Sequence, residues 1–456
     1  MEKHSGLLTD LYELTMAAGY IQTRFNPRAT FELFVRELPP RRNFLIAAGL
    51  EQALDHLESV RYTPEEIEFL RGHPVFKRVR DEFFDYLAAF RFTGDVWAMP
   101  EGTLVFAGEP LLRVTAQLAE AQILETALLA TLNFQTMIAS KAARVVQAAR
   151  GRNVIEFGTR RAHGADAGIL AARAAYLAGC QGTSNVLAGE RFGIPTFGTL
   201  AHSWIMAHDN EAEAFARFLD VFPEQATLLV DTYDVRAAVE KVIALGRKPR
   251  GIRLDSGDLV ADSLWVRRRL DEAAWQDVQI FASGDLDENR IEDLLAHGAR
   301  IDGFGVGTAL STSADAPSLG VIYKLVELEH AGEVRGAFKL SHAKATLPGR
   351  KQVYRFQNQE GKYSEDVIAL DGEEIPSGQP LLVPMMRAGR RVAPSPPLTE
   401  LRERCRDALE RLPDRYRRLD AAESYPVRQS PHLTALLEEV RRRITESESR
   451  TKKQRS

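Results

Sequence analysis

Aspartate and glycine residues recur directly after successive predicted strands in the middle of the chain. The aspartates can accept hydrogen bonds from ribose hydroxyls or hold a hydrated Mg²⁺, which prefers carboxylates together with phosphate oxygens. The glycines let a phosphate approach the backbone, and their N–H groups can cradle it at a helix start. A single Gly-Asp pair after a strand is usually a turn, but the repetition indicates a site for a sugar phosphate. The residues are Asp231, Asp255, Asp258, Asp285, Gly257, Gly284, Gly305 and Gly307, with Thr308 as a further hydroxyl donor.

Arginine residues near the same strands could bind an anionic substrate. Arg160 and Arg161 follow the strand predicted over 153–157, and Arg253 lies within a strand beside Asp255. A lone arginine in a strand is usually a surface residue or part of a structural ion pair. At the mouth of a phosphate-binding face, however, its planar guanidinium group can bind a carboxylate or phosphate through two charge-assisted hydrogen bonds.

His202 is the histidine that we favour for a catalytic role. It follows Gly198-Thr-Leu-Ala201 and a short strand predicted over 194–197, and His163 and His208 compete with it. A single histidine is more often structural, and a free histidine could equally act as a general base. The residue type alone therefore leaves its chemistry open.

Other common active-site motifs are absent from the sequence. It contains no P-loop and no HExxH zinc motif, and the third glycine of Gly303-Phe-Gly-Val-Gly307 comes one residue too early for a dinucleotide fingerprint. Simple kinase, metalloprotease and dehydrogenase functions are therefore disfavoured.

An alternation of strands and helices predicts how these loops are brought together. Short apolar runs are each followed by a polar loop and a helical pattern, which favours a parallel, barrel-like (β/α) domain over 121–344. In such a domain the carboxyl ends of the strands open onto one shared face. An open doubly wound sheet is the alternative. Strands are predicted over 153–157, 227–230, 251–254, 278–282 and 301–304, and helices over 119–150, 165–177, 235–245, 259–273 and 289–296.

The flanking segments predict further regions. Residues 1–120 mix short helices and strands and are expected to form an N-terminal α/β domain, which the strand-like segment 345–393 rejoins. A charged helical segment follows over 398–444. Residues 445–456 are polar without apolar content, and we predict a disordered tail.

Composition and charge restrict the class of protein and its partners. The chain has 456 residues, of which 45% are hydrophobic, and a formal net charge of −4, as in a soluble globular protein. This charge would attract neither nucleic acid nor an anionic membrane, so an anionic substrate must be bound by local cations. No apolar run approaches the roughly 18 residues that span a bilayer, and the first five residues lack the apolar core of a signal peptide. Cys180 and Cys405 are not spaced as in a disulfide framework or a zinc site. We therefore expect a cytoplasmic protein.

Taken together, the motifs resemble the nicotinate phosphoribosyltransferase family. The resemblance covers most of the chain up to about residue 395, and so many separated motifs in the same order make a chance similarity implausible. The motifs are Leu7-Leu-Thr-Asp-Leu-Tyr12, Phe31-Glu-Leu-Phe34, Ala47-Ala-Gly-Leu50, Glu156-Phe-Gly-Thr-Arg-Arg161, Gly182-Thr-Ser-Asn-Val-Leu-Ala-Gly189, Gly198-Thr-Leu-Ala-His202, Arg253-Leu-Asp-Ser-Gly-Asp258, Gly305-Val-Gly-Thr308, Leu319-Gly-Val-Ile-Tyr-Lys324 and Lys339-Leu-Ser341.

The resemblance implies an α/β fold: an incomplete (β/α) barrel of the type II phosphoribosyltransferase kind, with a flanking α/β domain and a C-terminal helical extension. It also implies a homodimer with active sites shared between subunits. The implied reaction converts nicotinate and 5-phosphoribosyl-1-diphosphate into nicotinate mononucleotide and diphosphate, in NAD biosynthesis. ATP is the implied co-substrate, hydrolysed through a phosphohistidine. Mg²⁺, held through the diphosphate and by Asp255 or Asp285, is the implied cofactor.

By position in these motifs, the resemblance assigns roles to individual residues. His202 matches the phosphohistidine, and Arg253 and Asp255 complete the expected catalytic set. Thr199 and Arg253 match nicotinate contacts, and Tyr12 matches an aromatic residue that stacks on the pyridine ring from the partner subunit. The other expected substrate-binding residues are Arg160, Ser184, Asp285, Gly305, Gly307 and Thr308.

Ser184 bears on the choice of substrate. Related nicotinamide-using enzymes have an aspartate at the matching position, which accepts a hydrogen bond from the amide, whereas a neutral serine would not repel a nicotinate carboxylate. Capping of the following helix is the alternative role for Ser184. Three other functions stay open: a nicotinamide phosphoribosyltransferase, which Ser184 disfavours; a quinolinate phosphoribosyltransferase, whose dicarboxylate would require more cations; and a non-catalytic metabolite sensor, which would not need the whole reaction set.

Overall fold

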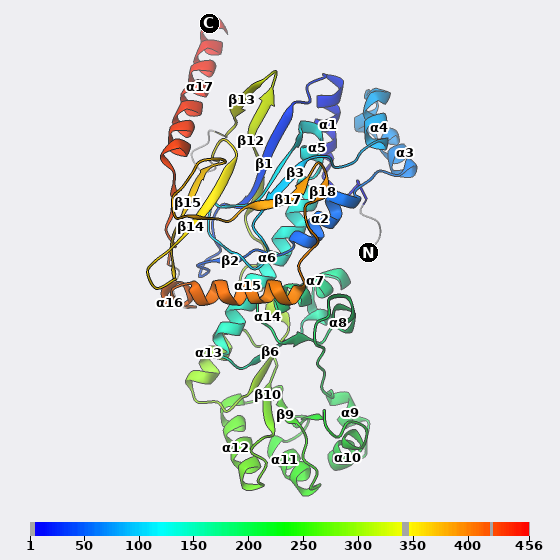
Figure 1. The fold of residues 1–456 in the computed structure, drawn as a ribbon. Helices are drawn as coiled ribbons and strands as arrows, with labels where there is room; N and C mark the ends of the chain where they lie inside the picture. Colours follow the sequence, from blue (N-terminus) through cyan, green and yellow to red (C-terminus); the bar gives the residue numbers. More distant parts are fainter. Residues whose placement is uncertain (1–4, 340–345, 420–422, 456) are drawn as a thin grey trace.

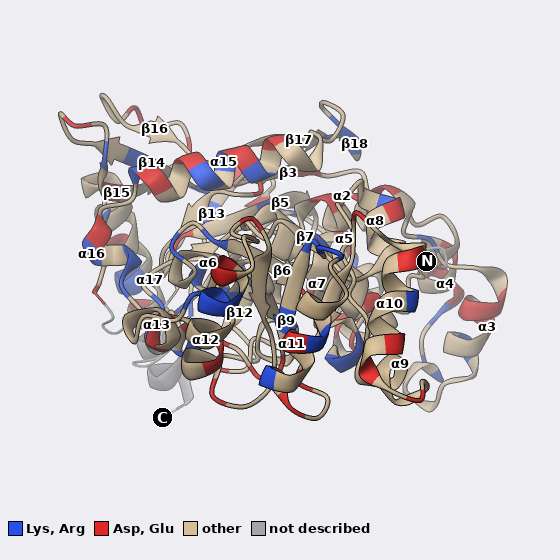
Figure 2. Cartoon of the chain, turned by 90° about the horizontal axis from the view of Figure 1, so that it is seen from below, with Lys and Arg blue, Asp and Glu red and all other residues tan. Residues whose placement is uncertain are grey.

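The computed structural model describes residues 5–339, 346–419 and 423–455 (Figure 1). A parallel sheet forms one half of the chain and an antiparallel sheet the other, and the long helix α6 (Glu125–Ala148) runs between them. Basic and acidic residues are interspersed in the view of Figure 2, without a large region of one sign. No helix in the described part of the chain is long and apolar enough to cross a membrane.

The parallel sheet has six short strands in the order β7-β6-β11-β10-β9-β8, and every neighbouring pair is parallel. Within the described residues its edge strands β7 and β8 do not pair with each other, so the sheet stays open. This arrangement confirms the predicted α/β fold with an incomplete barrel. The strands are β6 (Asn153–Glu156), β7 (Gly182–Thr183), β8 (Thr227–Leu229), β9 (Gly251–Leu254), β10 (Gln279–Ala282) and β11 (Gly303–Val306).

Aspartate side chains fix the start of three helices that follow these strands. Asp234, Asp258 and Asp287 each accept hydrogen bonds from backbone N–H groups in the first turn of the helix that follows, which satisfies donors that the helix itself leaves free. The helices of this half are α7 (Ala165–Leu177), α8 (Val186–Phe192), α9 (His202–Met206), α10 (Glu211–Val221), α11 (Val235–Ala244), α12 (Leu259–Glu272), α13 (Glu288–Ala296) and α14 (Thr308–Ser311), with a 3₁₀ turn, η2, over Thr159–Arg161.

The antiparallel sheet has seven strands in the order β13-β12-β1-β5-β3-β17-β18. They are β1 (Arg28–Val35), β3 (Asp95–Ala98), β5 (Pro110–Gln117), β12 (Val321–His330), β13 (Glu333–Gly336), β17 (Val383–Arg387) and β18 (Arg390–Arg391); β2 (Leu45–Ile46) pairs with β4 (Leu104–Val105). The helices of this half are α1 (Leu11–Gln22), α2 (Leu50–Ser59), α3 (Pro64–Gly72), α4 (Asp81–Ala88) and α5 (Leu118–Ile123), with a 3₁₀ turn, η1, over Pro74–Phe76.

Buried ion pairs on α6 tie the two halves together. Lys141 and Arg144 of α6 both pair with Glu288 of α13, and Arg144 also donates to the carbonyl oxygen of Arg41. All three charged side chains are at most 7% exposed. Because an unpaired buried charge is costly, removing one partner would destabilise the junction.

The C-terminal region differs from its prediction in three respects. Strands β12 and β13 belong to the antiparallel sheet, so the chain rejoins that sheet at Val321 and not at residue 345 as predicted. Residue 344, the predicted end of the barrel-like domain, and Leu340-Ser341 of the motif that begins at Lys339 lie outside the described residues. A four-stranded sheet consists of β16 (Gln379–Pro380), β14 (Lys351–Gln357), β15 (Tyr363–Leu370) and β19 (Val427–Gln429). Because β19 lies within 398–444, after α15 (Leu398–Arg411) and α16 (Asp414–Arg417), that segment is not wholly helical. Helix α17 (Pro431–Arg455) continues through the predicted tail, because Glu, Lys and Arg are good helix formers even without apolar neighbours.

Candidate active site

Three polar side chains hold the guanidinium group of Arg253 at the carboxyl edge of the parallel sheet. Its Nη1 donates to Oγ1 of Thr199 (2.7 Å), and its Nη2 donates to Oδ1 of Asp255 (2.7 Å). Its Nε donates to Oγ of Ser283 (2.8 Å). The three partners come from three different loops, and only 13% of the Arg253 side chain is exposed. Arg253 is therefore a cation fixed in one orientation, as recognition of a planar carboxylate requires.

Asp255 is kept ionised by its neighbours. Burial raises the pKa of its carboxyl group, but the Ser283 hydroxyl, Arg253 and His202 outweigh burial, and the net pKa is lowered. The Ser283 hydroxyl donates to the same oxygen of Asp255 that Arg253 contacts. Arg253, Asp255 and Ser283 thus form a closed triangle of charge-assisted hydrogen bonds.

His202 begins α9 and faces this triangle. Its Nδ1 lies 3.1 Å from Oγ1 of Thr232, and its Nε2 lies 3.8 Å from Oδ2 of Asp255. Its side chain is 40% exposed, which leaves the ring accessible. The competing histidines are placed differently: Nδ1 of His208 lies 2.7 Å from the carbonyl oxygen of Trp204, and His163 is exposed in the loop after η2.

Two of the predicted aspartates, Asp231 and Asp258, hold backbone N–H groups in place, whereas Asp285 is exposed. Oδ2 of Asp231 accepts hydrogen bonds from the Asp255 N–H (3.1 Å) and the Ser256 hydroxyl (2.6 Å), which fixes the loop after β9. Its Oδ1 is buried and has no partner in the described part of the chain. Asp258 caps α12, whereas Asp285 is exposed after β10.

Two of the predicted glycines are required by close packing between loops. Gly284 has φ +87°, and a Cβ atom there would lie 1.8 Å from the carbonyl oxygen of Asp255. A Cβ atom on Gly305 would lie 2.6 Å from the Phe157 ring. Gly307 and Thr308 follow at the start of α14, beside the backbone of Phe157. The structure therefore packs the loop after β10 against the loop after β9, and β11 against the end of β6, and it gives Gly284 and Gly305 a steric role besides the one expected toward phosphate.

Phe157 also belongs to this site, a role that was not predicted from the sequence. Its ring lines a cavity of about 520 Å³ that Thr199 and Phe281 also line. The Arg253 guanidinium lies 6.0 Å from the ring centre. The sequence feature that could have indicated this role is the position of Phe157, an aromatic residue that ends the strand predicted over 153–157 and precedes the loop with Arg160 and Arg161.

Glu156 holds the loop that carries Phe157 and Arg160. Its carboxylate is fully buried and accepts hydrogen bonds from the Thr183 hydroxyl (2.6 Å) and the Gly158 N–H, while burial raises its pKa. Arg160 itself is exposed in η2. The buried carboxylate of Glu156 thus anchors the loop that carries the exposed Arg160.

Ser184 is free of the capping role considered for it. Asn185 caps α8 instead, because its Oδ1 accepts the Ala188 N–H (2.9 Å). Ser184 is exposed, and its backbone N–H donates to the carbonyl oxygen of Glu156 (2.9 Å). The backbone of Ser184 is therefore held beside Glu156, which leads into the loop of Phe157 and Arg160.

Tyr12 lies apart from the other predicted residues of the same chain. It is 46% exposed on α1, in the half built on the antiparallel sheet, whereas β9 lies at the opposite end of the view in Figure 1. Burial and the nearby Glu125 raise the pKa of its hydroxyl. The site described above therefore assembles without Tyr12 from its own chain.

Comparison with known proteins identifies the family to which the chain is similar. Residues 7–133 match the N-terminal domain of nicotinate phosphoribosyltransferase, residues 377–437 match its C-terminal domain, and residues 138–316 match the C-terminal domain of quinolinate phosphoribosyl transferase. The chain is 47% identical over 450 residues to a nicotinate phosphoribosyltransferase of Mycobacterium tuberculosis, covering 97% of this chain and 95% of that one. It is 39% identical to a nicotinate phosphoribosyltransferase of Bacillus subtilis, covering 92% of each chain.

Solved structures agree in fold. The crystal structure of human nicotinic acid phosphoribosyltransferase matches with a TM-score of 0.84 and 30% identity, covering 94% of this chain and 99% of that one. A nicotinate-nucleotide pyrophosphorylase from Pyrococcus furiosus matches with a TM-score of 0.72 and 29% identity, covering 89% of this chain and 95% of that one. With relatives this similar over nearly its whole length, the chain belongs to the nicotinate phosphoribosyltransferase family.

Proposed function

We propose that this protein forms nicotinate mononucleotide and diphosphate from nicotinate and 5-phosphoribosyl-1-diphosphate, in NAD biosynthesis. The observation that carries the proposal is the fixed guanidinium group of Arg253, because it offers a cation of defined orientation beside the Phe157 ring. A pyridine carboxylate bound there would have its ring against Phe157 and its nitrogen directed at the ribose. Holding the nitrogen in line with C1′ lowers the barrier to transfer.

Two carboxylates at the same face suit Mg²⁺: the exposed Asp285, and Asp255 through Oδ2, the oxygen that Arg253 and Ser283 do not contact. The described residues contain no group of three His, Cys, Asp or Glu side chains that could hold a metal alone. Mg²⁺ is usually bound by one or two carboxylates together with substrate phosphates, and we assign Asp255 or Asp285 as its protein ligand. When bound, the ion neutralises charge on the departing diphosphate. The buried Oδ1 of Asp231, which has no partner among the described residues, can accept a hydrogen bond from metal-bound water.

His202 is proposed to couple ATP hydrolysis to this reaction. The imidazole takes the γ-phosphoryl group of ATP and releases ADP, and water later cleaves the phosphohistidine to free phosphate. The added charge would lie close to Asp255, which is now 3.8 Å from the ring, so repulsion would move the loop after β9. This displacement would link the ATP step to substrate binding.

The coupling is tested by the ATP hydrolysed per nucleotide formed. His202→Ala is expected to form the nucleotide slowly and without proportional ATP hydrolysis, whereas the exposed His163→Ala should keep the wild-type ratio. A His202→Ala enzyme that remains tightly coupled would reject the assignment.

Tyr12 is proposed to reach the active site of a partner subunit in a homodimer. Four apolar side chains on and before α1, Leu8, Leu11, Tyr12 and Met16, are between 38% and 53% exposed, which favours their burial against another subunit. Mixing inactive Tyr12→Ala and Arg253→Ala chains should restore about a quarter of the wild-type activity, because half of the dimers are mixed and one of their two sites is intact. No recovery after subunit exchange would place Tyr12 outside the site.

Substrate choice separates the proposed function from its rivals. The purified protein is incubated with 5-phosphoribosyl-1-diphosphate, Mg²⁺ and ATP, with nicotinate, nicotinamide or quinolinate as the base, and products are separated by chromatography. We expect nucleotide from nicotinate only, because Ser184 offers a neutral group. Product from nicotinamide or quinolinate would reassign the enzyme, and no product from any base would favour a sensor. A cytoplasmic location is part of the proposal and is tested by cell fractionation.

A further inference from the structure

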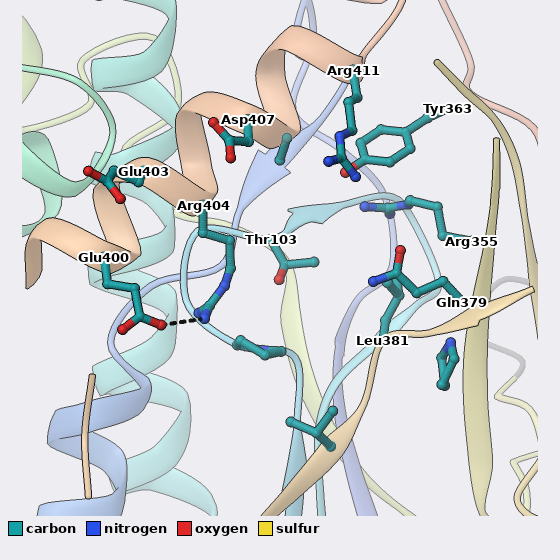
Figure 3. A pocket seen from close by; sticks show the side chains of 14 residues that line it. Thr103, Arg355, Tyr363, Gln379, Leu381, Glu400, Glu403, Arg404, Asp407 and Arg411 are labelled. Carbon is teal, nitrogen blue, oxygen red and sulfur yellow. Dashed lines mark hydrogen bonds and ion pairs between the residues drawn. The ribbon is translucent and has the colours of Figure 1, made fainter. Parts of the chain in front are cut away.

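A second cavity lies between α15 and the C-terminal sheet, apart from the candidate active site. Its volume is about 440 Å³, and it shares no lining residue with the cavity beside Phe157. Its walls come from α15, from β14, β15 and β16, and from the segment that precedes β4 (Figure 3). Cavities of roughly 300–1,000 Å³ are typical of small-molecule sites. This cavity, named here the C-terminal cavity, therefore has room for a metabolite.

Arg355 forms one wall of the C-terminal cavity, and the buried carboxylates of Asp366 and Glu109 hold its guanidinium group in place. Its side chain is 2% exposed, its Nε and Nη2 donate to Asp366, and Nη2 also donates to the carbonyl oxygen of Leu104 (2.9 Å). The guanidinium carbon lies 4.9 Å from the Tyr363 ring centre. Its Nη1 has no hydrogen-bond partner in the described part of the chain. One N–H face of a preoriented guanidinium thus remains available to a ligand.

Further donors line the same cavity. Arg411, in the last turn of α15, forms no ion pair or hydrogen bond through its side chain with any described residue, and Figure 3 shows it directed toward Tyr363, as Arg355 is. Gln379 of β16 and Thr103 also line the cavity, and their side chains have no hydrogen-bond partner among the described residues. Two guanidinium groups, an amide and a hydroxyl from separate elements thus surround one space. A tetrahedral anion with several acceptor oxygens can satisfy such dispersed donors better than a planar carboxylate can.

The α15 side of the cavity carries both signs of charge: Glu400, Glu403 and Asp407 line it together with Arg411 and with Arg404, whose guanidinium group donates to Glu400. Figure 3 shows Asp407 on the opposite side from Arg355. Carboxylates accept hydrogen bonds from hydroxyl groups but repel a second phosphate. The ligand that fits therefore carries one phosphate at one end and hydroxyl groups at the other.

We propose that the C-terminal cavity binds a small phosphate monoester of a polyol, such as a sugar phosphate. The phosphate lies between Arg355 and Arg411, within reach of Gln379 and Thr103, and the hydroxyl groups face Asp407. The site stands independently of the proposed catalytic function, because it is built from different strands and shares none of the catalytic residues.

Hydrogen–deuterium exchange of the full chain locates the binding of three probes: ribose 5-phosphate, inorganic phosphate and ribose. Ribose 5-phosphate should slow backbone exchange over 351–357 and 400–411, inorganic phosphate should do so at higher concentration, and ribose should have no effect. Arg411→Gln should raise the half-protecting concentration of ribose 5-phosphate by about tenfold or more, because a charge-assisted hydrogen bond is lost. The exposed Arg415, on α16 and outside the cavity wall, provides the matched control as Arg415→Gln.

The exchange pattern also separates this site from the active site. Protection of 253–258 by ribose 5-phosphate reports the active site and should be unchanged in Arg411→Gln. The proposal is overturned if saturating ribose 5-phosphate leaves 400–411 unprotected, or if Arg411→Gln binds it as the wild type does. In Asp407→Asn, the affinity for ribose 5-phosphate should fall close to the affinity for inorganic phosphate. If the wild-type chain binds the two probes with equal affinity, the proposed recognition of the polyol hydroxyl groups is refuted.

Discussion

Replacing Ser283 by alanine tests whether the orientation of Arg253 governs substrate binding. The change removes the acceptor of the Arg253 Nε–H and the hydroxyl that holds Asp255, while it leaves every charge in place. A hydrogen bond to a charged group contributes about 1.5–3 kcal/mol, which corresponds to roughly a 10- to 150-fold loss in kcat/KM. Because Arg253 is expected to bind nicotinate before and during the reaction, the loss should appear mainly as a higher KM for nicotinate, with kcat little changed.

Steady-state kinetics with nicotinate as the varied substrate measure this effect, and thermal unfolding is recorded in parallel. The control is Ser263→Ala on α12, where an equally buried serine donates to the Val260 carbonyl oxygen and accepts the Arg300 N–H. The control should lower the unfolding temperature without raising KM. A Ser283→Ala enzyme with unchanged KM, or a control with the same rise in KM, would refute the positioning role.

Three further changes test other parts of the structure. Ser184→Asp should lower kcat/KM for nicotinate by about fivefold or more, because the aspartate repels the substrate carboxylate. The neutral Ser184→Asn should not lower it. Equal kinetics of the two variants would show that Ser184 does not contact the substrate. Gly284→Ala forces a Cβ atom against the Asp255 carbonyl oxygen and should lower kcat/KM by about 100-fold. Gly298→Ala is the control, because Gly298 has φ +82° with nothing near its Cβ atom, so the change should affect stability alone. Similar activity in both variants would show that the loops after β9 and β10 are not in contact. Burial raises the pKa of Glu13 to about 7, so the folded protein binds a proton at this carboxyl group more tightly than the unfolded chain does. The free energy of unfolding should therefore fall as the pH rises from about 4.5 to 7. Glu13→Gln should flatten that fall in urea titrations, and an unchanged slope would contradict the raised pKa of Glu13.

The catalytic half was largely predictable because its strands and helices repeat one local pattern. The bounds of β9 match the prediction, and β8, β10 and α12 differ from it by one residue at an end. The strand β12 was missed because nothing in its own sequence says that it pairs with β1 and not with the parallel sheet. Pairing between distant strands depends on tertiary contacts and not on local propensity.

The candidate site was predicted in its residue types but not in its contacts. Arg253 lies in β9 and Asp255 directly after it, so an extended backbone places these two side chains, two residues apart, on the same face of the sheet. The hydrogen bond from Arg253 to Thr199 joins residues 54 positions apart and depends on how two loops pack. Ser283 directly precedes Gly284 and Asp285, which were predicted site residues, yet only the structure shows that its hydroxyl faces Arg253. The role of Asn185 in capping α8 likewise had to be seen.

The order of strands in the antiparallel sheet has a consequence for synthesis on the ribosome. Strand β1 ends at Val35, but its neighbour β12 begins only at Val321. At roughly 5–20 residues per second, translation needs about 15–60 s to make the segment between them. During that interval β5 can cover one edge of β1, while the other edge, along a mostly buried and apolar strand, has no partner. Nascent chains are therefore vulnerable to aggregation for most of their elongation, and chaperone protection of this edge would matter more for yield than the final stability of the protein.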